Sequence, residues 1–219
     1  MVIKTLFLNF KSKIKRVKKA IKSLKKKNGI ILIDDKNREN EGDIIFAAEN
    51  ITIPQMALTI RNCSGIVCLC ITEKLRKKFF LPMMVIKNSS KFQTPFTISI
   101  ESKKNVTTGV SAHDRINTIK TILYNNKNFC FNMPGHIFPL CANPGGLLIR
   151  RGHTEATIDL LNLSGFKKIG VLCELTNKDG SMSKIKEIII FSKKTKMPIL
   201  TIEDIIIYMH YKKIFKNFF

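Results

Sequence analysis

The first segment with the residue types of a chemical site is acidic and runs from Asp34 to Asp43. Five of the chain's 16 acidic residues fall within these ten positions, although the formal net charge is +22. Clustered carboxylates repel one another unless a cation lies among them, and Mg²⁺ prefers oxygen ligands of this kind. Glu39, Glu41 and Asp43 alternate, so an extended backbone would turn all three toward one face. A solvated acidic turn explains the composition equally well, and the segment alone does not decide between the two.

A second segment, from Arg150 to Thr154, combines two guanidinium groups with a turn and a helix start. Gly152 lets the chain turn, and Thr154 is a candidate N-cap of the following helix. The free N–H groups of a helix N-terminus, together with Arg150 and Arg151, favour an anion such as a phosphate monoester. His153 lies at the same turn and could offer a ring nitrogen to a metal ion. A capped helix with a surface histidine is the alternative, and the coincidence of Arg, Gly and helix start favours the phosphate site.

Two further residues could transfer protons. His136 follows a Pro-Gly turn and precedes an apolar run, so a stiff backbone would hold an imidazole able to act as acid or base near neutral pH. Glu174 lies in the apolar segment 171–175, and a carboxylate is rarely buried without a partner. It either pairs with a basic group or serves catalysis, and this segment alone does not choose.

These segments occur in the order and spacing of one enzyme family. From about Gly29 to Asp204 the chain resembles 3,4-dihydroxy-2-butanone 4-phosphate synthase, and a match in several parts is far more specific than any one part. The matching motifs are Asp34-Asp35, Arg38-Glu39-Asn40-Glu41-Gly42-Asp43, Ser64-Gly65-Ile66-Val67-Cys68, Thr107-Thr108-Gly109-Val110-Ser111, Asp114-Arg115, Pro134-Gly135-His136, Gly152-His153-Thr154-Glu155 and Gly170-Val171-Leu172-Cys173-Glu174.

The resemblance implies a lyase of riboflavin biosynthesis. The family converts D-ribulose 5-phosphate to L-3,4-dihydroxy-2-butanone 4-phosphate and formate, through enolisation, dehydration, skeletal rearrangement and formate release. It further implies Mg²⁺ as cofactor, with Mn²⁺ as a substitute, and a homodimer. Relatives often carry a second, GTP cyclohydrolase domain with a cysteine zinc site. Nothing of that kind follows here, so we expect a monofunctional enzyme.

The same resemblance assigns roles to individual residues. It implies that Glu39 and His153 hold the metal ion, and that His136 and Glu174 are catalytic. The residues implied to bind substrate are Arg38, Glu39, Asp43, Arg150, Arg151, Gly152, His153, Thr154 and Glu174. This division suits the chemistry, because enolisation beside a ketone needs a base at C3 and a cation near the developing oxyanion.

The chain departs from the family beside His136. Met133 and Cys141 stand where the family commonly has arginine, so two positive charges are lost there. The implied metal ligands and proton-transfer residues are all present. We therefore expect these changes to affect catalytic efficiency rather than the kind of reaction.

The elements that must position these residues follow from hydrophobic periodicity and cap signals. Strands are predicted at Ile30–Ile33, Ile66–Ile71, Phe96–Ile100, Ile137–Leu140, Leu147–Ile149, Ile169–Leu175 and Ile199–Thr201. Helices are predicted over about 14–26, 54–63, 73–79, 112–124, 155–164, 184–195 and 203–212. Helices interleaved irregularly with strands predict an α+β fold, with α/β/α layers around a mixed twisted sheet. The sequence has no Gly/Ser/Pro linker, so one domain over 1–219 is expected, with 1–13 as a candidate disordered tail.

The charge balance raises a different hypothesis, a nucleic-acid-binding protein. The chain has 38 basic and 16 acidic residues, and such a surface attracts RNA and acidic lipids. Its basic residues are 31 Lys and 7 Arg, however, whereas binding of phosphate groups favours Arg. The lysines are spread along the chain, and Trp, a common stacking platform for bases, is absent. We therefore favour a solvated Lys-rich surface and expect no specific nucleic-acid partner. A degenerate relative that keeps only the fold is the third hypothesis.

Cysteine usage and hydropathy indicate the compartment. None of the six cysteines forms a C-x-x-C pair, which argues against a zinc ribbon or a thioredoxin-type motif. Cys68 and Cys70 lie in an apolar run that predicts a buried strand with reduced thiols, as in a cytosolic protein. No apolar stretch approaches the roughly 20 residues that span a bilayer, so no membrane partner is expected.

Overall fold

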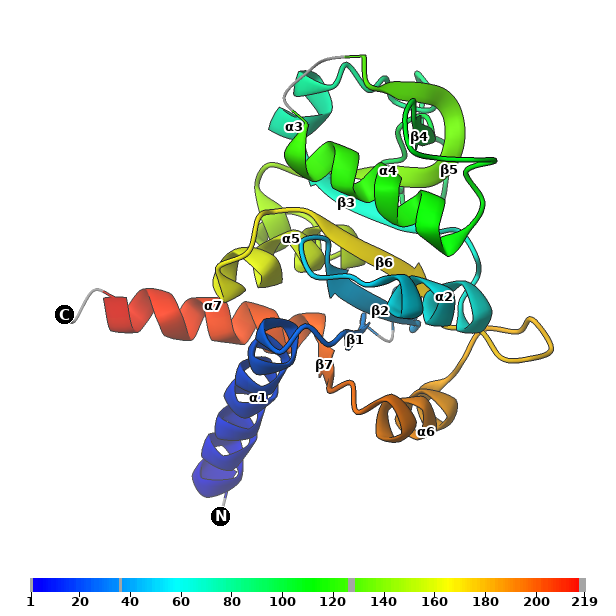
Figure 1. Ribbon diagram of the computed structural model, residues 1–219. Helices are drawn as coiled ribbons and strands as arrows, with labels where there is room; N and C mark the ends of the chain where they lie inside the picture. The colour runs from blue at the N-terminus through cyan, green and yellow to red at the C-terminus, as the bar shows by residue number, and fades with distance from the viewer. Residues whose placement is uncertain (1, 36, 126–128, 217–219) are drawn as a thin grey trace.

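Within residues 2–35, 37–125 and 129–216, which the computed structural model describes, seven strands form one mixed sheet (Figure 1). The strands are β1 (Ile30–Ile33), β2 (Gly42–Ala47), β3 (Cys68–Thr72), β4 (Ile100–Ser102), β5 (Phe131–Ala142), β6 (Gly170–Glu174) and β7 (Ile199–Thr201). Their order across the sheet is β4-β5-β3-β6-β2-β1-β7. The pairs β1/β7 and β3/β5 are parallel and the other neighbours are antiparallel, which confirms the predicted mixed sheet.

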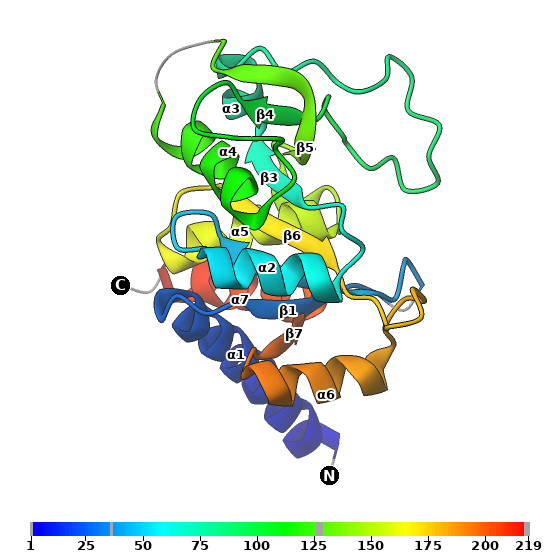
Figure 2. The same cartoon turned by 45° about the vertical axis from the view of Figure 1, so that its right-hand side comes forward.

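Helices cover both faces of the sheet (Figures 1 and 2). They are α1 (Val2–Lys25), α2 (Ile53–Asn62), α3 (Glu73–Lys78), α4 (Ala112–Tyr124), α5 (His153–Ser164), α6 (Ile185–Thr195) and α7 (Ile202–Lys216). Alternate residues of β2 enter opposite layers, because side chains alternate along a strand. Ile44 and Phe46 join the core that includes α2, α4 and α6, while Ile45 and Ala47 join the core of α1, α5 and α7. The predicted three-layer α+β architecture is confirmed.

The strand predicted at Phe96–Ile100 shares only Ile100 with β4, and strand β2 was not predicted at all. Its six residues are all buried, and it lies between β1 and β6 in the sheet. The strand begins inside the acidic segment, at Gly42 and Asp43, and its apolar residues follow only from Ile44, so the charged residues concealed the start of the strand. The predicted strand Leu147–Ile149 was wrong. Residues Gly146–Leu148 form a 3₁₀ turn, and Leu148 and Ile149 are exposed.

A side chain caps the start of α4, and the starts of two other helices differ from those predicted. The Ser111 hydroxyl accepts a hydrogen bond from Asp114 N at 3.1 Å, so Ser111 is the N-cap of α4. Helix α5 begins at His153 with Gly152 as its N-cap, so Thr154 is inside the helix rather than its cap. Helix α1 begins at Val2 and therefore includes residues 2–13, which were a candidate tail. Met1 lies outside the described residues.

A bidentate ion pair joins the first and last helices. Arg16 Nε and Nη2 donate to the two carboxylate oxygens of Asp204 at 2.7 and 2.6 Å, and the Asp204 side chain is fully buried. Asp204 also accepts from Thr201 N at 3.0 Å, so the same carboxylate fixes the turn from β7 into α7. Across the part of the chain that is described, no helix is both long and apolar enough to cross a membrane.

Candidate active site

The residues predicted to do chemistry converge on one small cavity. It has a volume of about 180 Å³ and lies where the loop after β1, the start of β2, the end of β6 and the start of α5 meet. We call it the acidic cavity. The predicted site residues that line it are Arg38, Glu39, Asp43, Arg150, His153, Thr154 and Glu174. Glu41 lines it as well, so three alternating carboxylates do face a common space even though the backbone turns at residues 37–39.

Asp34 organises the loop that carries these carboxylates. Its carboxylate is buried and accepts hydrogen bonds from Glu39 N at 3.0 Å, Glu41 N at 3.1 Å and Arg38 Nη1 at 2.9 Å. Charge-assisted bonds of this kind are stronger than neutral ones. One buried side chain therefore fixes the backbone on either side of Asn40, which adopts a left-handed conformation with φ 53°.

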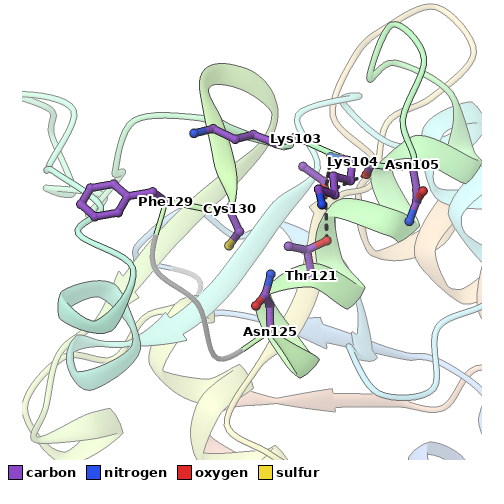
Figure 3. Close-up of a pocket in the computed structure, with 8 residues that line it drawn as sticks. Lys103, Lys104, Asn105, Thr121, Asn125, Phe129 and Cys130 are labelled. Atoms are coloured by element: carbon purple, nitrogen blue, oxygen red, sulfur yellow. Dashed lines mark hydrogen bonds between the residues drawn. The ribbon is translucent and has the colours of Figure 1, made fainter.

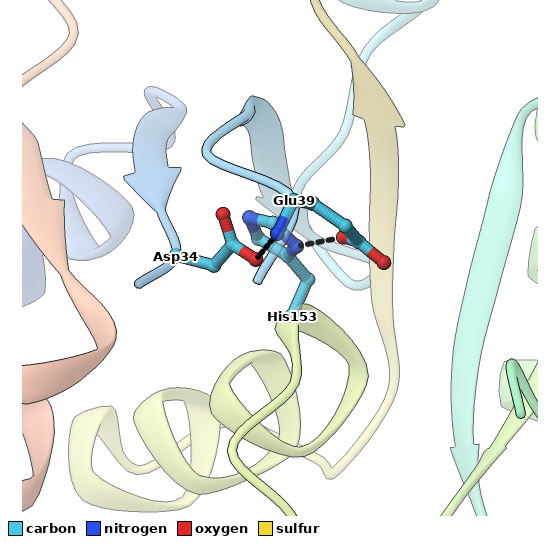
Figure 4. A group of neighbouring side chains, drawn as sticks. All are labelled: Asp34, Glu39 and His153. Atoms are coloured by element: carbon cyan, nitrogen blue, oxygen red, sulfur yellow. Dashed lines mark hydrogen bonds and ion pairs between the residues drawn. The ribbon is translucent and has the colours of Figure 1, made fainter. Parts of the chain in front are cut away.

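The side chains of Glu39 and His153 point toward each other, and Asp34 lies beside them (Figure 4). His153 Nδ1 lies 3.4 Å from Glu39 Oε2 and 3.7 Å from Asp43 Oδ2. One ligand atom each from Asp34, Glu39 and His153 lies within 4.8 Å of the other two. Asp43 Oδ1 and His153 Nε2 are buried and, among the described residues, have no hydrogen-bond partner. Orphaned buried polar atoms beside clustered carboxylates are what a cation site offers.

The electrostatics of the cluster agree with this interpretation. Burial raises the pKa of the Asp43 carboxyl to about 7, although the nearby His153 opposes the shift. For His153, burial opposes the charged form, but the carboxylates of Asp43, Glu39 and Asp34 outweigh it and raise its pKa to about 9. The pKa of Glu39 is lowered because the bonds and charges of His153 and Arg38 outweigh its burial. The carboxylates of the cluster thus favour a positive charge among them, and the protonated imidazole of His153 supplies that charge.

The arginines beside the cavity already have partners. Arg38 Nη1 donates to Glu39 Oε2 at 2.7 Å, and Arg150 Nη1 donates to the fully buried carboxylate of Glu155 at 2.6 Å. Arg151 is not among the residues that line the cavity, and it pairs instead with Asp35 at 3.0 Å. Only two of the three guanidinium groups therefore face the substrate space.

Gly152 contributes through its lack of a side chain. It is not among the lining residues, and a Cβ at this position would meet the guanidinium of Arg150 and the carboxylate of Glu155. Its backbone forms the N-cap of α5. Gly152 therefore has a structural role: its lack of a side chain leaves space for the Arg150–Glu155 ion pair beside the cavity.

A loop that the sequence analysis did not connect with the site lies over two of these arginines. The ring of Phe92 lies 5.0 Å from the guanidinium carbon of Arg38, and its carbonyl accepts from Arg150 Nη2 at 3.0 Å. Thr94, two residues on, lines the cavity. The turn is closed by a hydrogen bond from Asn88 Nδ2 to Thr94 O at 2.9 Å. No sequence signal marked Phe92, because an aromatic residue in a polar loop carries no periodicity.

Glu174 ends β6 and is held by a hydroxyl. Ser64 Oγ donates to Glu174 Oε2 at 2.6 Å, and the strand register places Glu174 beside Asp43. Glu174 is partly exposed at the cavity rather than buried among apolar groups. This position leaves the carboxylate accessible to a substrate.

His136 is not among the residues that line the acidic cavity. It lies in β5, where its Nδ1 is 2.6 Å from Glu101 Oε2, and 43% of its side chain is exposed. The structure therefore brings seven of the predicted site residues together and leaves His136, Arg151 and Gly152 outside the cavity wall. The catalytic role of His136 stays a prediction.

A larger cavity of about 450 Å³ lies between β4, α4 and β5 (Figure 3). Its eight lining residues include Lys103, Lys104 and Thr121, but no carboxylate and no imidazole. It offers no ligand set for a divalent ion. This cavity is larger than the acidic cavity, but its lining lacks the ligands that the acidic cavity offers.

A mixed sheet between helical layers, with carboxylates, an imidazole and a helix N-terminus around one cavity, is the arrangement of an enzyme rather than of a nucleic-acid-binding module. The family model for 3,4-dihydroxy-2-butanone 4-phosphate synthase matches residues 18–208. The chain belongs to the 3,4-dihydroxy-2-butanone 4-phosphate synthase family, which confirms the resemblance.

Individual relatives agree. The chain is 57% identical over 205 residues to the 3,4-dihydroxy-2-butanone 4-phosphate synthase of Serratia proteamaculans, covering 93% of this chain and 94% of that one. It is 59% identical over 210 residues to that of Buchnera aphidicola subsp. Schizaphis graminum, covering 95% and 99%.

Two solved structures share the fold. A 3,4-dihydroxy-2-butanone 4-phosphate synthase in complex with two magnesium ions is 34% identical, with a TM-score of 0.82, and the match covers 89% of this chain and 95% of that one. The synthase of Candida albicans is 40% identical, with a TM-score of 0.81, covering 88% and 96%.

Proposed function

We propose that this enzyme converts D-ribulose 5-phosphate to L-3,4-dihydroxy-2-butanone 4-phosphate and formate in riboflavin biosynthesis. The observation that carries the proposal is the convergence of Glu39, Asp43 and His153 on one cavity beside the N-terminus of α5. Family membership supplies the reaction, and this cluster supplies the groups that the reaction needs.

Glu39 and His153 would hold Mg²⁺, and the carboxylate of Asp34 lies close enough to join them. The two orphaned buried atoms, Asp43 Oδ1 and His153 Nε2, fit a bound cation or its water. The solved family member with two magnesium ions supports this choice, and Mn²⁺ accepts similar ligands. When bound, the ion would stabilise negative charge on a substrate oxygen.

The phosphate of the substrate would bind beside the metal ligands. Arg38, Arg150 and Thr154 line the cavity, and the N-terminus of α5, which is the positive end of the helix dipole, lies next to them. A phosphate would compete with Glu39 and Glu155 for the two guanidinium groups. It would thereby draw each arginine from its resting partner toward the substrate.

Two carboxylates could move protons within the cavity. Asp43 is buried 3.7 Å from His153, and burial raises the pKa of its carboxyl. Glu174 is more exposed and is oriented by Ser64, so the two groups differ in environment. Carboxylates in different environments can divide acid and base roles in one reaction.

His136 would reach the substrate from a second copy of the chain. It is 43% exposed and is not among the cavity residues, whereas the family resemblance makes it catalytic. A homodimer that places His136 of one protomer at the acidic cavity of the other would account for both statements. The cytoplasm is the proposed compartment, since all six cysteines are free.

Formate release tests the proposal. Purified protein with Mg²⁺ and D-ribulose 5-phosphate should release formate, EDTA should stop the release, and fresh Mg²⁺ or Mn²⁺ should restore it. A folded protein that releases no formate under these conditions would instead support the degenerate-relative hypothesis.

A further inference from the structure

We propose that Glu101 is a positioning residue for catalysis: its carboxylate fixes the tautomer of His136, so that Nε2 is the nitrogen that exchanges protons with the substrate. This inference rests on the proposed function, in which His136 is catalytic. Its basis is the contact between Glu101 Oε2 and His136 Nδ1, which are 2.6 Å apart.

The chemistry of the two groups sets the direction of this bond. An ionised carboxylate can only accept, so the hydrogen between the two atoms belongs to Nδ1. In a neutral imidazole with a hydrogen on Nδ1, the lone pair lies on Nε2. The Glu101 side chain is only 16% exposed while the His136 side chain is 43% exposed, so the carboxylate lies deeper in the protein than the ring that it contacts.

The strand pairing is interrupted to make this contact. In the β4/β5 pair, Ile100 lies opposite Ile137, but the next residue, Glu101, lies opposite Asn132. Residues 133–136 are looped out of the ladder between these two partners, and His136 is among them. A bulge that re-aims one side chain beside a site is a common use of this irregularity.

Backbone contacts hold the looped-out segment in place. Gly135 N donates to Ser99 Oγ at 3.1 Å, and a Cβ at Gly135 would overlap the backbone of Ile100. Arg115 Nη1 donates to the carbonyl of His136 at 2.7 Å. The histidine backbone is therefore fixed from two sides before its ring meets Glu101.

A neighbouring loop leaves space for the pair. Gly109 has φ +83°, and a Cβ at this position would overlap the Glu101 carboxylate and crowd His136 Nδ1. The buried carboxylate of Asp114 holds this loop, because it accepts from Gly109 N at 3.2 Å and from the Thr107 hydroxyl at 2.8 Å. Three segments, residues 99–101, 107–115 and 133–136, thus converge on one carboxylate–imidazole contact.

A double-mutant cycle on formate release tests the coupling. Glu101→Ala and the nearly isosteric Glu101→Gln should each lower kcat about 10- to 100-fold and change KM little. This loss is a part of the rate enhancement that a general acid or base contributes. In a His136→Ala background the same changes should lower kcat no further, because Glu101 acts through His136. Glu203→Ala, which removes an exposed carboxylate on α7, is the matched control and should leave kcat unchanged. Equal losses with and without His136, or unchanged kcat in both Glu101 variants, would overturn the proposal.

Nitrogen NMR of the imidazole tests the contact without turnover. The chain has four histidines, so the His136 signals are assigned by their loss in His136→Ala. At a pH where the ring is neutral, the native protein should carry its hydrogen on Nδ1, and Glu101→Ala should shift the population toward Nε2–H. A native His136 with its hydrogen on Nε2 refutes the proposal even if formate is released. A native protein that shows the expected tautomer but releases no formate leaves the contact intact and refutes the proposed function.

Discussion

The Nδ1 atom of His153, the first residue of α5, lies 3.4 Å from Oε2 of Glu39, in the loop after β1. The two elements are far apart in the sequence, and the sheet brings them together because β1, β2 and β6 are neighbours in its central part. Asp43 lies 3.7 Å from the same imidazole. The first prediction follows from this concentration of ligand atoms.

Mg²⁺ should stabilise the folded protein through this cluster. A ligand that binds only the folded state adds about 2.7 kcal/mol when its concentration is 100 times Kd. The unfolding temperature should therefore rise when Mg²⁺ is added and return to its original value when EDTA removes the ion. His153→Ala should abolish the shift, whereas His113→Ala, which changes an exposed histidine, should retain it. A shift of native size in His153→Ala would place the ion elsewhere.

Phe92 should affect substrate binding more than the chemical step. Its ring lies against Arg38 and its carbonyl against Arg150, so Phe92→Ala loosens the two arginines proposed to bind phosphate. A cation–π contact at an accessible site is worth about 0.5–1 kcal/mol, which predicts a KM raised about two- to fivefold with little change in kcat. Phe80→Ala removes an exposed ring that stacks on Phe129 and serves as the control. A lower kcat at unchanged KM would mean that the loop acts on catalysis instead.

Two inactive variants should restore activity when they are combined. Co-expressed Glu39→Gln and His136→Ala chains would form heterodimers in which one site has both an intact acidic cavity and an intact His136 from its partner. With random pairing, formate release should recover to about a quarter of the native rate. If His136 served the cavity of its own chain, no heterodimer would contain an intact site, and the mixture would stay inactive.

Glu73 should make stability depend on acid pH. Hydrogen bonds from Arg76 and from the Cys141 thiol lower the pKa of Glu73 from its usual 4.5 to about 2. A carboxyl group whose pKa is lower in the folded state stabilises the protein above its unfolded pKa, and this contribution disappears as pH falls from 4.5 toward 2.

The test is urea unfolding of Glu73→Gln. The variant should be less stable than the native protein by about 1 kcal/mol at pH 7, because the Glu73–Arg76 pair is partly exposed and solvent screens it. The difference should shrink at pH 3. Glu203→Gln, which loses an exposed ion pair with Lys13, should show a smaller effect. A difference for Glu73→Gln that is equal at both pH values would show that the charge of Glu73 is not the cause.

The sequence predicted most elements of the fold because hydrophobic periodicity is local. Strands such as Ile30–Ile33 and Ile199–Thr201 were predicted with the bounds that the structure has. Strand β2 was missed, because it begins inside the acidic segment at Gly42 and Asp43, and because its partner β6 is distant in sequence. Leu147–Ile149 has the composition of a strand but overlaps a 3₁₀ turn, in which Leu147 N donates to Asp159 Oδ2 at 2.9 Å.

The sequence predicted the site residues whose type and spacing indicate their chemistry. It did not predict residues whose role depends on a side-chain partner that is distant in the sequence. Acid clustering pointed to Glu39 and Asp43, and both line the cavity. Arg151 was expected to face an anion, but Asp35 binds it, and pairing across loops leaves no local pattern. Glu101 was not identified for the same reason. Its partner, His136, is brought to it by a bulge that strand periodicity does not encode.

Glu39→Gln tests the central claim most directly, because it removes one negative charge from the proposed metal site and keeps the shape of the side chain. At saturating Mg²⁺, formate release should fall at least about 100-fold, Mn²⁺ binding measured by electron paramagnetic resonance should weaken, and the unfolding temperature should stay near that of the native protein. A variant with near-native formate release and native Mn²⁺ affinity would contradict the assignment of Glu39 and His153 as the ligands of the divalent ion.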